Sequence, residues 1–146
     1  MTKSFTVFLL VLIAQFGCSP SGPVISISQL QVVAPAPGRT PSVAYMTISN
    51  QGRAAVELVA VSSSQFARVE MHQTVLRDGV ARMQALSSVT IVAKSSVAFE
   101  PGGRHVMLFQ PTTGLIPGAE ISLQFKFASG EMLLITTPLA TRIPVD

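Results

Sequence analysis

Two histidines and two methionines have the residue types and the spacing of a metal site. They are His72, Met83, His105 and Met107, and both histidines of the chain belong to this set. Ten residues separate His72 from Met83, twenty-one separate Met83 from His105, and one separates His105 from Met107. Thioether sulfur is a soft donor and imidazole nitrogen an intermediate one. The set therefore favours copper, above all Cu(I), over Mg²⁺, Ca²⁺ or Mn²⁺.

The cysteine content narrows the role of such a site. A blue-copper electron-transfer centre needs a cysteine thiolate, and the only cysteine, Cys18, lies far ahead of the four candidates. With one cysteine the chain also has no internal disulfide. The residues indicate metal carriage by neutral donors, in a site without carboxylates, rather than electron transfer.

Each candidate residue also has a structural interpretation. Methionine in a strand commonly fills the core, and Met46, Met71 and Met132 are interpreted in that way. A single histidine is commonly a surface or hydrogen-bonded residue. On this alternative, the chain is an exported β-sandwich module that binds another protein, and its histidines and methionines are incidental.

A predicted β-hairpin positions the first two candidates. Its strands are Phe66–Thr74 and Val80–Leu86. Asp78-Gly79 is a strong signal for a two-residue turn. With that turn Thr74 pairs with Met83, and His72 lies diagonal to Met83, roughly 7–8 Å away at Cα. Both side chains are long enough to converge on one metal ion.

A second strand carries the other two candidates. His105 and Met107 share a strand face because they are two residues apart. The turn Pro101-Gly102-Gly103 fixes where their strand, His105–Phe109, begins. We expect this strand to bring its pair to the hairpin.

The rest of the chain predicts an all-β fold. Further strands are expected at Val24–Val33, Val43–Ser49, Val56–Ser62, Val89–Ala93, Val97–Phe99, Glu120–Phe127 and Glu131–Pro138. Turn signals separate them every eight to twelve residues, which is typical of a β-sandwich or barrel. No segment has a convincing helical period.

Composition limits the function classes. The 146 residues allow one domain behind a leader, and the net charge of +3 comes from scattered basic residues. Without a basic stripe and interleaved aromatics, nucleic-acid binding is not expected. No nucleophile–base pair or paired-carboxylate site is evident, so we expect no enzyme activity.

The N-terminus predicts export. Residues 1–17 have the basic start and short apolar run of a signal peptide, and they resemble a lipoprotein signal in which Cys18 becomes the lipidated first residue. Residues 18–23 are then a tether, and 24–146 the copper-binding domain. The alternative is ordinary cleavage near Gly17. We expect a periplasmic location, or the outer face of the bacterial cytoplasmic membrane, with membrane contact only through that lipid.

The spacing His-x10-Met-x21-His-x-Met resembles the signature of the periplasmic copper chaperones called PCuAC. The flanking residues are similar too: Ala44-Tyr45-Met46-Thr47-Ile48, Glu70-Met71-His72, Asp78-Gly79, and Pro101-Gly102-Gly103 before His105-Val106-Met107-Leu108. Phe109-Gln110 departs from the family pattern but touches no expected ligand.

The resemblance implies a single cupredoxin-like β-sandwich that binds one Cu(I) through the four candidates. It also implies a partner in the cell envelope that accepts copper. That partner is the CuA subunit of cytochrome c oxidase or another copper carrier.

Overall fold

Residues 24–141 form ten β-strands and no helix. The computed structural model describes residues 24–141, so the predicted signal peptide, the tether and Cys18 lie outside them. The strands are β1 (Ile25–Val33), β2 (Ser42–Asn50), β3 (Val56–Ser62), β4 (Phe66–Arg77), β5 (Val80–Leu86), β6 (Val89–Ile91), β7 (Ser95–Phe99), β8 (Arg104–Pro111), β9 (Glu120–Phe127) and β10 (Met132–Ala140). Within residues 24–141, nothing has the form of a membrane-crossing helix.

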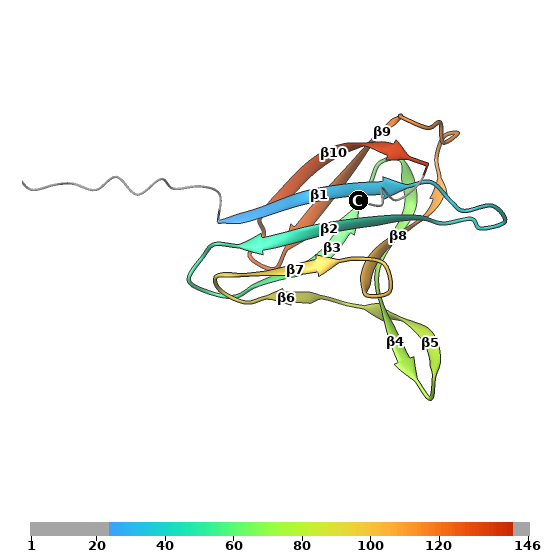
Figure 1. Cartoon of the computed structure of the whole chain (residues 1–146). Coiled ribbons are helices and arrows are strands. Elements are labelled where there is room, and N and C mark those ends of the chain that lie inside the picture. The colour runs from blue at the N-terminus through green and yellow to red at the C-terminus, as the bar shows by residue number, and fades with distance from the viewer. Residues whose placement is uncertain (1–23, 142–146) are drawn as a thin grey trace, which may run out of the picture.

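The strands form two layers that join at one parallel contact (Figure 1). The first layer runs β5-β4-β8-β2-β1, and β7 also pairs with β2. The second layer runs β10-β9-β3-β6, and the end of β1 pairs with the end of β10. The all-β sandwich expected from the sequence is confirmed.

The core lies between the layers and follows from side-chain alternation. In β9, Ile121, Leu123, Phe125 and Phe127 are buried, whereas the residues between them face outward. In β2, Ala44, Met46 and Ile48 are buried in the same alternate pattern. Two facing apolar surfaces of this kind are what hold a sandwich together.

The β4–β5 hairpin matches its sequence-based prediction in turn and register. Asp78 and Gly79 both have positive φ, 52° and 76°, as a type I′ turn requires. Thr74 pairs with Met83, so the diagonal relation between His72 and Met83 is confirmed. β4 is longer than expected and ends at Arg77.

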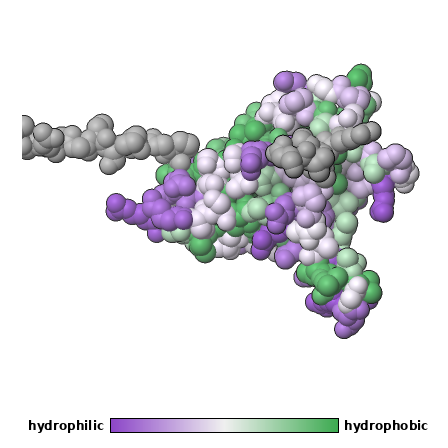
Figure 2. Space-filling view, viewed as in Figure 1, coloured by the Kyte–Doolittle hydropathy of each residue, from purple (hydrophilic) through white to green (hydrophobic). Residues whose placement is uncertain are grey.

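The hairpin extends away from the body of the sandwich (Figure 1). Apolar surface gathers on it above a polar tip (Figure 2). The large exposed apolar side chains of this hairpin are Leu76, Val80 and Met83. β5 is an outer strand of its layer.

Three methionines were predicted to lie in the core; two of them do, and the third does not. Met46 and Met71 are buried. Met132 is 57% exposed, so its assignment to the core was wrong. The reason is register, because Met132 pairs with Lys126 on the outward face of β9.

Asn50, at the end of β2, is a buried polar side chain that joins three segments. It is 0% exposed. Its Nδ2 donates to the carbonyls of Ala54 at 2.8 Å and Ile91 at 3.0 Å, and its Oδ1 accepts from the Gly52 amide at 2.9 Å. One side chain thus fixes the β2–β3 turn against β6.

We expect Asn50→Ala to lower the free energy of unfolding by about 3 kcal/mol, because it removes hydrogen bonds to one buried and several part-buried backbone groups. Chemical denaturation of the apo protein measures this. Gln51→Ala is the matched control at the exposed neighbouring position, with an expected change within about 0.5 kcal/mol. Equal effects of the two substitutions would contradict the role given to Asn50.

Candidate metal centre

The two histidines lie directly opposite each other on neighbouring strands. His72 of β4 pairs with His105 of β8 in the antiparallel register. Their rings are stacked, with centroids 6.0 Å apart and planes 16° from parallel. His105 is 5% exposed, and the His72 side chain is 14% exposed. The expectation that β8 meets the hairpin is confirmed at these two residues.

The methionines lie on the same face but differ in exposure. Met107 is half-buried and pairs with Glu70, two residues before His72. Met83 lies on β5, across from Thr74, and is 61% exposed. Because residues two apart share a strand face, this register places all four candidates on one side of β5-β4-β8. His72, His105 and Met107 form the inner part of the group, and Met83 lies at its open edge.

Each histidine has one nitrogen in a hydrogen bond and one without a partner. His105 Nδ1 lies 3.2 Å from the Gly103 carbonyl, which can only accept, so Nδ1–H is the donor. His72 Nε2 lies 2.9 Å from Glu70 Oε2. An ionised carboxylate also only accepts, so Nε2–H donates.

The remaining nitrogens are buried lone-pair donors. Among residues 24–141, only three buried side-chain nitrogen or oxygen atoms lack a hydrogen-bond partner, and two are His72 Nδ1 and His105 Nε2. A buried polar atom without a partner is unfavourable and calls for an explanation such as a bound ion. Neutral rings with these hydrogen bonds carry their free electron pairs on these two atoms, as metal ligation requires.

The surroundings favour a neutral His105 and an ionised Glu70. Burial is the main cause that lowers the pKa of His105 below its ordinary value. A neutral His105 keeps its lone pair. Hydrogen bonds from His72 and Arg68 lower the pKa of the Glu70 carboxyl, which stays ionised as an acceptor.

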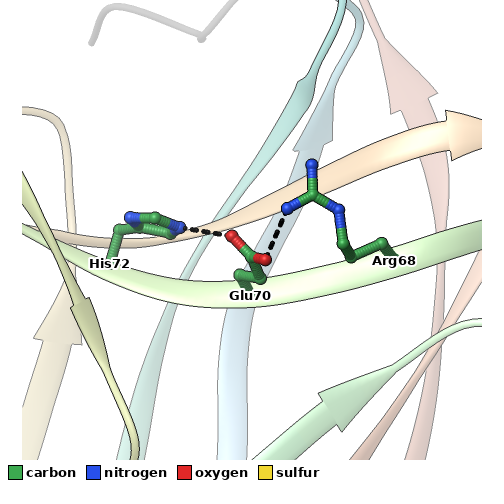
Figure 3. A network of polar contacts seen from close by, with 3 residues as sticks. All are labelled: Arg68, Glu70 and His72. Carbon is green, nitrogen blue, oxygen red and sulfur yellow. Dashed lines mark hydrogen bonds and ion pairs between the residues drawn. The ribbon is translucent and has the colours of Figure 1, made fainter.

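Glu70 is the residue beside the candidate site that the sequence interpretation missed. The site was expected to lack carboxylates, and instead Glu70 contacts a candidate ligand. Its Oε1 accepts from Arg68 and its Oε2 from His72 (Figure 3). The alternation of β4 was a usable signal, because it already places Arg68, Glu70 and His72 on one face.

The donor set limits which metals fit. Among the described residues, no group of three or more histidine, cysteine, aspartate or glutamate side chains is arranged to hold a metal ion. Residues 24–141 therefore contain no cluster of three or more carboxylates of the kind that commonly binds Ca²⁺. Two imidazoles with neighbouring thioethers suit a soft, singly charged ion instead.

Sequence comparison identifies a family and two relatives. The chain matches the LpqE-like family, described as "Putative lipoprotein LpqE-like", over residues 25–139. A protein of Rickettsia prowazekii (strain Madrid E) is 30% identical over 106 residues, which cover 72% of this chain and 59% of the relative. A protein of Leifsonia xyli subsp. xyli, with lipoprotein in its name, is 30% identical over 116 residues, covering 79% and 69%. The chain thus spans less than two thirds of the Rickettsia relative.

Several solved structures share the fold. The solution structure of Cu(I)-bound DR1885 from Deinococcus radiodurans has a TM-score of 0.68 and 25% identity, covering 89% of this chain and 87% of that one. The copper-bound PCuAC domain of PmoF2 has a TM-score of 0.63 and 23% identity, covering 83% and 94%. The apo PCuAC domain of PmoF1 has a TM-score of 0.67 and 21% identity, covering 82% and 95%. The resemblance seen in the sequence is confirmed: the chain belongs to the LpqE-like family and has the cupredoxin-like β-sandwich of PCuAC domains.

Proposed function

We propose that this protein is a copper chaperone that binds one Cu(I) through His72, Met83, His105 and Met107. The observation that carries the proposal is the pair of buried imidazole nitrogens without hydrogen-bond partners, on the face that also holds both thioethers. Neutral nitrogen and sulfur donors match Cu(I), whose single charge needs little compensation.

The relatives support the same class of ligand. Two of the similar structures contain copper, namely Cu(I)-bound DR1885 and the copper-bound PCuAC domain of PmoF2. The shared fold makes the same cargo reasonable here. The donor atoms of this chain provide the independent argument.

The difference in exposure suggests how the ion is transferred. The two histidines, through their buried nitrogens, hold one side of the copper ion, whereas Met83 lies exposed on an outer strand. A thiolate of the acceptor displaces Met83 first, because that thioether is the most accessible ligand and a thiolate binds copper more strongly. Stepwise exchange then moves Cu(I) to the acceptor without unfolding the sandwich.

The place of delivery follows from the predicted leader. An exported chain, lipidated at Cys18, would work in the cell envelope, in the periplasm or at the outer face of the cytoplasmic membrane. We propose as acceptor the CuA subunit of cytochrome c oxidase or another envelope copper carrier. The protein itself is a carrier and not an enzyme in this proposal.

We expect His105→Ala or Met107→Ala to weaken Cu(I) binding by more than the roughly 10–100-fold that is typical when an outer-shell partner is lost. Competition with a chromophoric Cu(I) chelator under reducing conditions measures the affinity. Unfolding curves of the apo variants check that the fold is intact. Wild-type affinity in the folded double variant would exclude both residues as ligands.

Met83 is tested separately, because its exposure allows a clean substitution. X-ray absorption of the Cu(I)-loaded protein should count two sulfur and two nitrogen ligands. In Met83→Leu the sulfur count should fall to one. Met132→Leu is a matched control, because Met132 is similarly exposed at 57% but lies on β10 in the other layer. A sulfur count unchanged by Met83→Leu would remove Met83 from the site.

Metal selectivity tests the donor chemistry as a whole. We expect Cu(I) to raise the melting temperature of the protein, because it binds the folded state. Ca²⁺ and Mg²⁺ at millimolar concentration should leave it unchanged, since they need several oxygen ligands. Stabilisation by Ca²⁺ and not by Cu(I) would overturn the proposed function and favour a different role for this β-sandwich.

A further inference from the structure

Three charged or titratable side chains form a row along one face of β4. They are Arg68, Glu70 and His72, each two residues from the next (Figure 3). Arg68 contacts Oε1 of Glu70, and His72 Nε2 lies 2.9 Å from Oε2. The last residue of the row, His72, is a candidate copper ligand. The hydrogen bonds along the row therefore affect how the His72 ring is oriented.

Both carboxylate oxygens of Glu70 are engaged in hydrogen bonds with neighbouring side chains. Each of its two carboxylate oxygens already accepts a hydrogen bond, one from a guanidinium and one from an imidazole. Carboxylate oxygen is also a poor donor for Cu(I) compared with imidazole or thioether. The position of Glu70 therefore fits an outer partner of His72 and does not fit a ligand.

The neighbouring strand anchors the row at its other end. Arg68 pairs with Phe109 of β8, and its guanidinium carbon lies 3.9 Å from the centre of the Phe109 ring. A cation held over an aromatic face is attracted to it. Phe109 follows His105 and Met107 on the same strand face, so β8 contributes both the second ligand pair and this anchor.

The two histidines are held by opposite nitrogens. His72 uses Nε2 for Glu70 and leaves Nδ1 without a partner. His105 uses Nδ1 for the Gly103 carbonyl and leaves Nε2 without a partner. Metal-binding histidines commonly donate their other N–H to a carboxylate or a backbone carbonyl, which fixes the ring and the tautomer. Both kinds of acceptor occur here.

We propose that Glu70, held by Arg68, is a positioning residue that commits His72 to bind Cu(I) through Nδ1, whereas His105 binds through Nε2. This inference rests on the proposed function and adds the identity of the ligating atoms. Arg68 acts only through Glu70, and Phe109 acts only through Arg68.

The ligating nitrogens can be read directly by NMR. Protein with ¹⁵N-labelled histidine is recorded with and without Cu(I), which is diamagnetic, and long-range proton–nitrogen spectra identify the nitrogen that changes. We expect the His72 Nδ1 and His105 Nε2 resonances to shift on loading. A shift of His72 Nε2 in place of Nδ1 would overturn the inference and leave the proposed function intact.

Substitutions test the role of Glu70. We expect Glu70→Ala to weaken Cu(I) binding by about 10–100-fold, the usual range for an outer-shell partner. Glu70→Gln should give a smaller loss, because its amide oxygen still accepts from His72 Nε2–H. Glu57→Ala and Glu57→Gln are the controls at an exposed glutamate on β3, with affinities within about twofold of wild type. Unfolding curves of each apo variant establish that it is folded.

A double-mutant cycle tests whether Arg68 works through Glu70. Arg68→Met should weaken Cu(I) binding in the wild-type background and have no further effect in Glu70→Ala. Additive losses, or a folded Glu70→Ala variant that keeps wild-type affinity and Nδ1 ligation, would contradict the proposal. Absence of Cu(I) binding by the wild type is a separate outcome, because it removes the proposed function and this inference with it.

Discussion

The candidate site depends on the register between β4 and β8. His72 lies opposite His105 because seven residues of each strand keep one antiparallel alignment without a bulge. Side chains alternate along a strand, so a slip of one residue would turn His72 to the opposite face. The apolar pair Met71–Val106, next to the histidines and buried on the other face, opposes such a slip. The core thereby sets the geometry of the donors.

The alignment of β4 with β8 also decides which charged side chains lie near the candidate copper ligands. A Cu(I) ion bound by two imidazoles and two thioethers keeps its positive charge, and the sequence alone suggested that nothing nearby compensates it. The structure places the Glu70 carboxylate one hydrogen bond from His72. The ion pair with Arg68 offsets that negative charge. The carboxylate can thus orient an imidazole without turning the site into one for a hard, doubly charged cation.

The sequence predicted the parts of the site that depend on residues close together in the chain, such as a turn and the strand pairing beside it. Asp78-Gly79 fixes a two-residue turn, and the turn alone fixes the pairing of Thr74 with Met83. The contact between His72 and His105 is different, because 32 residues and three further strands lie between them. No turn chemistry sets that register. The family resemblance implied a shared site, but the pairing itself became visible only in the structure.

The difference between contacts set by neighbouring residues and contacts set by long-range strand pairing also explains what the sequence interpretation missed. Alternation puts Arg68 and Glu70 on the face of His72, so their proximity was within reach of the pattern. The contact of Arg68 with Phe109 depends on the long-range register of β4 with β8. Met132 was misassigned for a related reason, because apolar character alone does not tell which face of β10 meets the core. Its pairing with Lys126 decides that face.

A β-sandwich fold hosts many functions, so the fold alone does not make this protein a copper carrier. What distinguishes it is the position of the donors within the sheet. β5 is an outer strand, β4 is the next one in, and β8 lies beside β4. The candidate site therefore runs from two histidines with buried ring nitrogens to an exposed methionine at the margin of one layer. An acceptor can approach that margin and exchange ligands while the core between the two layers stays closed, which is the physical requirement for a carrier that must both hold and release its ion.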